Sequence, residues 1–151
     1  MVYDQPNPKQ TQNCHLAIQE MHLDKETTER IRMSYRKKMN ILTSFDLENL
    51  CTTTGVAFVI IKTLIAPSKI STHELLPRRA LTIEIEWLET ETTWLINIHA
   101  PNNKSTHHQF WNEIDAKRCD KRIPKPDFIF RDFIVMEIDW SLAMTQMWLR
   151  P

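Results

Sequence analysis

Alternating apolar and polar residues predict that most of the chain consists of β-strands. The pattern is clearest at residues 80–87, where Leu81, Ile83 and Ile85 alternate with polar neighbours. A short turn followed by a second run of this kind predicts a hairpin, and a dense β-branched run at residues 55–61 predicts an interior strand. The expected strands are residues 16–18, 55–61, 80–87, 93–99 and 127–135.

Two other segments have the three-to-four-residue spacing of an amphipathic helix. The first covers residues 25–38 and follows Asp24, whose side chain suits an N-cap. Ile31, Tyr35 and Met39 are expected on the inner face of this helix.

The second predicted helix covers residues 105–119, with Ser105 as its N-cap. Its inner face is expected to consist of His107, Phe110, Trp111 and Ile114. Residues 67–77 lie between two prolines and are interpreted as a loop. The resulting order of strands and helices predicts an α/β (α+β) fold in which helices cover a largely antiparallel sheet.

Composition and charge narrow the class of protein. The 151 residues suffice for one domain, or form a piece of a larger one, and 42% apolar with 25% charged residues is typical of a globular chain. A net charge of zero excludes an overall electrostatic attraction to nucleic acid or to anionic membranes. The polar residues 1–13 are interpreted as a loose leader and lack the apolar core of a signal peptide, and no apolar run is long enough to span a bilayer.

Cysteine and glycine usage adds two expectations. Cys14, Cys51 and Cys119 are odd in number and widely spaced, which favours a soluble protein in a reducing, intracellular setting. Gly55 is the single glycine, so turns that need a positive φ must use other residues.

Polar residues gather where three predicted strands end. Gln19 and Glu20 end the first, residues 97–102 end another, and Asp132 interrupts the last. Asp132 is either a strand-end acid paired with a cation or a ligand of a metal ion. Two carboxylates from different strands are sufficient protein ligands for Mg²⁺ or Mn²⁺.

Residues 16–23, 95–102 and 128–135 resemble, in that order, motifs of the endonuclease/exonuclease/phosphatase superfamily. The resemblance is closest to the endonuclease domain of fungal LINE-type retrotransposons. Supporting matches are residues 55–64, 79–81 and 110–111. It implies a partial four-layer α/β/β/α sandwich at residues 14–135, followed by a tail at residues 136–151 with a weak helical pattern.

The same resemblance implies a Mg²⁺- or Mn²⁺-dependent phosphodiesterase that nicks DNA. Within it, Glu20 would bind the metal and Asp132 would orient or activate the attacking water. His99 would take the catalytic position that a tyrosine holds in the family, and Asn102 would contact the substrate phosphate.

Several positions depart from the family pattern. Arg131 and Ile134 stand where the motif around Asp132 has glycine and asparagine, and Arg78 stands where relatives tend to have glycine. The family's first strand and its terminal Ser-Asp-His motif have no counterpart in residues 1–151. Hydrolysis is therefore expected to be impaired. The alternatives are a non-catalytic fragment with a structural or interaction role, and a phosphatase acting on small phosphoesters.

The missing segments also predict a defect in packing. The strands at residues 56–61, 81–87 and 94–98 would lose part of their cover, which would expose apolar sheet surface and favour self-association.

Overall fold

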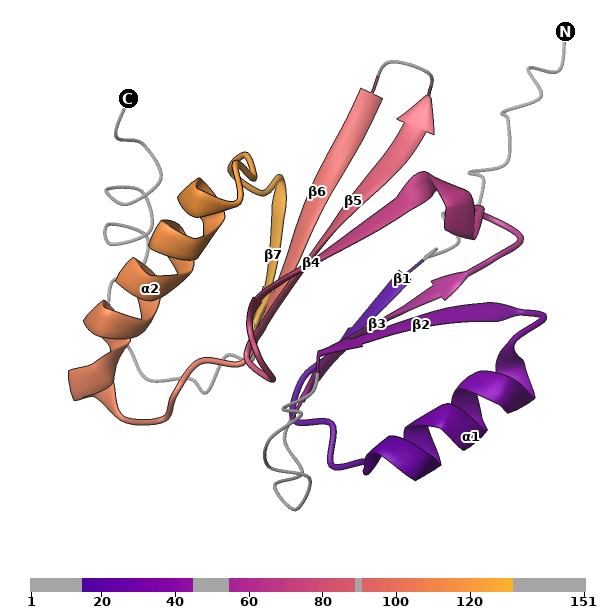
Figure 1. Ribbon diagram of the computed structural model, residues 1–151, viewed down its shortest axis with the longest axis horizontal. Coiled ribbons are helices and arrows are strands. Elements are labelled where there is room, and N and C mark those ends of the chain that lie inside the picture. The colour runs from indigo at the N-terminus through magenta and orange to yellow at the C-terminus, as the bar shows by residue number, and fades with distance from the viewer. Residues whose placement is uncertain (1–14, 45–54, 89–90, 132–151) are drawn as a thin grey trace, which may run out of the picture.

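The computed structural model describes residues 15–44, 55–88 and 91–131 (Figure 1). In chain order the elements are β1 (His15–Ile18), α1 (Lys25–Tyr35), β2 (Met39–Ser44), β3 (Val56–Ile61), the 3₁₀ helix η1 (Pro67–Lys69), β4 (Ile70–Leu76), β5 (Ala80–Leu88), β6 (Glu91–Ile98), the 3₁₀ helix η2 (Lys104–Thr106), α2 (His107–Asp120) and β7 (Phe128–Arg131). The predicted leader and tail lie outside the described residues, and so do Asp132 and Ile134.

The described strands form two sheets. One is antiparallel with the order β1-β3-β2, and the other has the order β4-β5-β6-β7. Within the second sheet only β6 and β7 run parallel, and α2 makes the long connection between them. The predicted mixed α+β class with largely antiparallel sheets is therefore confirmed.

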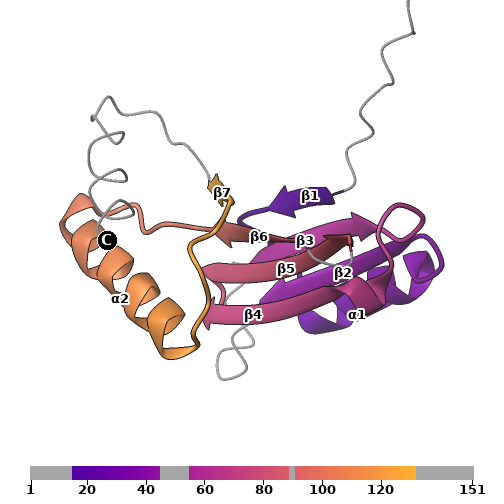
Figure 2. The same cartoon turned by 90° about the horizontal axis from the view of Figure 1, so that it is seen from above.

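The two sheets pack face to face, with α1 outside the first sheet and α2 outside the second (Figures 1 and 2). The core between the sheets consists of Val56, Phe58, Ile60, Ile65, Leu81, Ile83, Ile85 and Leu95. A second core lies between α2 and the sheet and includes Leu76, Ala80, Ile96, Ile98, Phe110, Trp111 and Ile114. Because β6 contributes to both cores, its residues 95–98 are buried without interruption.

The expected loss of cover over the sheets is wrong for the residues that the structure describes. Phe58 and Ile60 of β3 and Ile83 of β5 are fully buried. Exposed apolar side chains lie instead on the edge strands, where Leu16 of β1 is 59% exposed and Phe128 of β7 is 58% exposed. Met33 and Tyr35 of α1 and Leu64 are exposed as well. The faces of the sheets are thus covered in the described part of the chain, and self-association stays a prediction.

The segment interpreted as a loop between Pro67 and Pro77 is instead η1 followed by β4. Ser71, Thr72 and Glu74 are exposed because β4 is an edge strand, so the segment lacks the apolar alternation that identified its neighbours.

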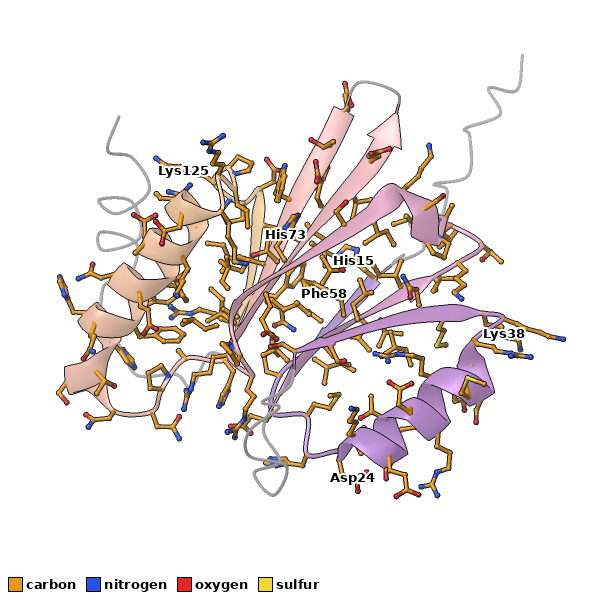
Figure 3. The ribbon with its side chains drawn as sticks, viewed as in Figure 1. His15, Asp24, Lys38, Phe58, His73 and Lys125 are labelled. Atoms are coloured by element: carbon orange, nitrogen blue, oxygen red, sulfur yellow. The ribbon has the colours of Figure 1, made fainter. Side chains whose placement is uncertain are left out.

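The first helix is shorter than predicted. It ends at Tyr35, which is 50% exposed, and Met39 begins β2. Figure 3 shows Asp24 at the beginning of α1 and Lys38 near the start of β2. The Asp24 side chain caps the helix by accepting the Thr27 N–H at 2.6 Å, and this hydrogen bond lowers the pKa of Asp24.

The side chain of Arg32 holds α1 against β2. The Arg32 guanidinium donates to the carbonyl of Ile41 and to the hydroxyl of Thr43, both at 3.2 Å. In α2, Phe110, Trp111 and Ile114 form the buried face as predicted, but Thr106 rather than Ser105 is the N-cap. Neither helix of the described part of the chain is long and apolar enough to cross a bilayer.

Candidate functional site

A buried asparagine joins the ends of β1 and β6. Asn97 of β6 is fully buried, and its Nδ2 donates to the carbonyls of Ile18 and Ala57, both at 2.9 Å. Its Oδ1 accepts a hydrogen bond from Nε2 of Gln19. The bonds to Ile18 and Ala57 cross from one sheet to the other, and the bond to Gln19 reaches the residue directly after β1, so the chain segment with Gln19 and Glu20 is fixed against β6.

Glu20 and His99 face each other beside this asparagine. Oε1 of Glu20 lies 4.0 Å from Nε2 of His99, and their side chains are 45% and 12% exposed. The backbone of Glu20 has a φ of 50°, in the left-handed region that non-glycine residues seldom adopt. The predicted meeting of these two strand ends is therefore present, with a solvent-accessible carboxylate at its centre.

Backbone hydrogen bonds hold both partners of this pair. The N–H of Met21, directly after Glu20, donates to the carbonyl of Gly55 at 2.9 Å. The N–H of His99 donates to the carbonyl of Arg79 at 2.8 Å, which anchors the histidine to the turn between β4 and β5. The Glu20–His99 pair thus rests on main-chain contacts from both sheets.

The end of β7 reaches the same region. Ile98 pairs with Arg131 in the parallel register, so the chain leaves β6 and β7 at one end of the sheet. Arg131 and Gln19 line a groove of about 310 Å³ between β1 and β7, together with His15, Leu16, Ala17, Ile129 and Phe130. Figure 2 shows these two edge strands side by side. Asp132, predicted as the catalytic aspartate, follows Arg131 and lies outside the described residues.

The groove is partly dehydrated. Burial lowers the pKa of the His15 imidazole and of the Arg131 guanidinium below their ordinary values. The His15 ring makes an edge contact with the ring of Phe130, at a centroid distance of 5.4 Å. A neutral imidazole and a cationic side chain therefore flank the approach to Gln19.

Asn102 lies in the exposed loop between β6 and α2. The loop is ordered by Asn103, whose Oδ1 accepts from the N–H and the hydroxyl of Ser105 at 3.0 and 2.9 Å. Nε2 of His107 lies 2.6 Å from the carbonyl oxygen of Pro101. His107 therefore has a structural contact in this loop, and the phosphate role of Asn102 stays a prediction.

Whether a divalent cation can bind here depends on which side chains are available as ligands. Within residues 15–44, 55–88 and 91–131, no group of three or more histidine, cysteine or acidic side chains could hold a metal ion. Mg²⁺ needs only one or two carboxylates because it retains several waters. The exposed carboxylate of Glu20 fits that requirement, whereas Oδ1 of Asn97 is already bonded to Gln19.

Asn97 belongs to one of the polar strand ends in the sequence, but no role was predicted for it. Asn97 is the one polar residue within the buried run Leu95 to Ile98 of β6. A polar side chain in such a run must find hydrogen-bond partners in the interior. That signal identifies Asn97 as special, but it does not identify Gln19 as the partner.

The sequence matches no protein-family model, and no curated protein matches it. The geometry around Glu20 and His99 therefore carries the functional proposal, beside the motif resemblance.

Proposed function

We propose that the chain is a retrotransposon-derived endonuclease/exonuclease/phosphatase domain that binds a divalent cation and phosphodiesters, with impaired hydrolysis. The observation that carries the proposal is the 4.0 Å approach of Glu20 to His99 at the meeting of β1 and β6. These residues belong to two of the three motif segments on which the resemblance rests.

The architecture supports the same proposal. Two sheets packed face to face, with one helix outside each, agree with the partial α/β/β/α sandwich that the resemblance implies (Figure 1). The third motif segment also fits, because Arg131 lines a groove with Gln19. The described parts of all three segments thus lie at one end of the two sheets.

The chemistry assigned to the site follows from its donors. A bound divalent cation would polarise a phosphoryl oxygen. Glu20 would hold the cation with its exposed carboxylate, and Asp132 would be the second carboxylate. His99 would donate a hydrogen bond from its ring nitrogen to a phosphate oxygen. Glu20 and His99 follow strands of different sheets, so substrate would bind across the junction.

Hydrolysis is proposed to be weaker than binding. Ile134 has no group that can hydrogen-bond a phosphate, and losing one such preorganised donor typically costs roughly 10²–10³ in rate. Arg131 adds a long cationic side chain to the groove beside the site. Neither of these two departures from the family pattern alters the carboxylate of Glu20, so the chain should still bind the cation.

Calorimetric titration with Mn²⁺ tests the binding half of this proposal. The parent chain should give saturable binding, and Glu20→Gln should abolish it because the amide carries no charge. Glu86→Gln is a matched control, since Glu86 is an exposed glutamate of β5. Absence of saturable binding in the parent, or equal loss in both variants, would overturn the proposal.

Nicking of supercoiled plasmid tests the catalytic half. With Mg²⁺ or Mn²⁺ we expect slow nicking that Glu20→Gln and a chelator remove. Soluble phosphoesters assayed in parallel separate DNA cleavage from a small-molecule phosphatase activity. Saturable Mn²⁺ binding without any nicking would favour the non-catalytic alternative.

A further inference from the structure

The carboxylate of Glu20 lies between two fixed points of the chain. On one side, the carbonyl of Ile18 and the side chain of Gln19 are both bonded to Asn97. On the other side, buried Met21 donates its N–H to Gly55. Glu20 is the single residue between these anchors, and its backbone is left-handed.

The asparagine is suited to act as the anchor. It is fully buried, both of its amide protons go to main-chain carbonyls, and its oxygen accepts from Gln19. Its rotation is therefore fixed by three bonds, and the Gln19 bond transfers that fixed orientation to the turn. A non-glycine residue stays in the left-handed region when its surroundings over-determine it.

We infer that Gln19 and Asn97 are positioning residues that hold the Glu20 carboxylate in place for cation binding. The inference rests on the proposed function. It identifies contacts made by residues that do not bind the cation themselves but determine the affinity of the site for it. Removing partners of this kind typically lowers metal affinity about 10- to 100-fold. Neither residue needs to touch the cation or the substrate.

Gln19→Met is the sharpest test. Methionine is similar in length and cannot donate the hydrogen bond, while the two bonds from Asn97 to Ile18 and Ala57 remain. Because Gln19 is only half-buried, the variant should fold like the parent. Gln109→Met, on the exposed face of α2, is the matched control.

Two measurements are needed on these chains. Calorimetry should show Mn²⁺ affinity about 10-fold or more lower in Gln19→Met than in the parent and in Gln109→Met. Amide hydrogen exchange followed by NMR should show faster exchange at Met21 in Gln19→Met, with the amide of Ile60 unchanged. The exchange result reports the anchoring of the turn and does not depend on a cation.

The outcomes separate the two proposals. If the parent binds Mn²⁺ and Gln19→Met binds it equally well, the positioning role is overturned and the proposed function stands. If the parent shows no saturable binding, the proposed function is overturned. In that second case, faster exchange at Met21 would still support the anchoring of the turn by Gln19, and unchanged exchange would overturn it.

Discussion

In the described part of the chain, two buried polar side chains link the two sheets by hydrogen bonds, and each link fixes a different part of the chain. Asn97 connects β6 to β1 and β3, next to Glu20 with its φ of 50°. Ser44, also fully buried, connects β2 to Glu74 of β4 through its hydroxyl and accepts the N–H of Arg78 at 2.8 Å. Arg78 has a φ of 65°, so each link lies beside a left-handed residue that is not glycine.

The two links differ in the role of the nearby glutamate carboxylate. Glu74 accepts the hydrogen bond from Ser44 and is thereby part of the link itself. Glu20 is not part of the Asn97 link, and its carboxylate faces His99 and solvent. In this chain a buried polar link beside a left-handed residue therefore occurs both with and without a free carboxylate. It becomes evidence for a site only where it presents a side chain that can still bind a ligand.

The largest expected effect is that of Asn97→Leu. Leucine leaves the carbonyls of Ile18 and Ala57 and the amide of Gln19 without their partner, and each buried unsatisfied group costs about 1–3 kcal/mol. We expect the free energy of unfolding, measured in urea, to fall by about 3 kcal/mol.

Thr82→Val is the control for Asn97→Leu. Thr82 is a buried polar residue of β5, and its hydroxyl makes no hydrogen bond among the described residues. The unfolding free energy of this variant should not fall, and it should rise by about 1 kcal/mol, because valine removes a buried hydroxyl that has no partner. Equal losses in the two variants would show that the Asn97 bonds contribute nothing specific.

Ser44→Ala should have a smaller effect on stability and none on cation binding. It removes the partner of the Arg78 N–H and of Glu74, at a cost of about 1–2 kcal/mol in urea unfolding. Mn²⁺ affinity measured on the same preparation should equal that of the parent. A loss of affinity as large as that in Gln19→Met would erase the distinction between the two links.

Glycine in place of Glu20 or Arg78, the left-handed residues beside the two links, should raise stability by a smaller amount. A left-handed backbone disfavours side chains by about 1–2 kcal/mol, and the greater freedom of glycine in the unfolded chain offsets part of this. The free energy of unfolding of Arg78→Gly and of Glu20→Gly should each be about 0.5–1 kcal/mol higher than that of the parent chain.

Cation binding should separate these two glycine variants. Mn²⁺ binding should persist in Arg78→Gly and vanish in Glu20→Gly, because only the latter removes the proposed ligand. Lower stability in both variants would mean that neither residue is strained.

The sequence predicted those parts of the fold that local pattern determines. Alternation located β5 and β6, and the dense β-branched run located β3 at the centre of its sheet. It missed β4, whose exposed edge position removes the apolar alternation. It extended α1 too far because Met39 continues the helical spacing of Ile31 and Tyr35, although Met39 begins β2.

The candidate site was predictable in part. Strand-end polarity and the motif resemblance both selected Glu20 and His99, which the structure places 4.0 Å apart. The bond from Gln19 to Asn97 joins β6 to the residue directly after β1, 78 positions away in the sequence and next to the other sheet. No local pattern encodes such a pairing, because it depends on how the sheets are stacked. Arg78, interpreted as standing at a glycine position, does have the left-handed backbone that glycine favours.

The smallest expected effect concerns His15, in the groove beside the Asn97 link. Burial lowers the pKa of this imidazole in the folded chain, so the unfolded chain binds more protons. The free energy of unfolding should therefore fall as the pH decreases through the ordinary histidine value of about 6.5. His15→Phe keeps a ring against Phe130 and removes this titration, so its unfolding free energy should depend less on pH over that range. Urea unfolding of both chains at pH values above and below the histidine range measures the difference. An NMR titration that gave His15 a pKa at or above the ordinary histidine value would contradict this. It would show that the groove is hydrated, and that Gln19 bonds to Asn97 next to water.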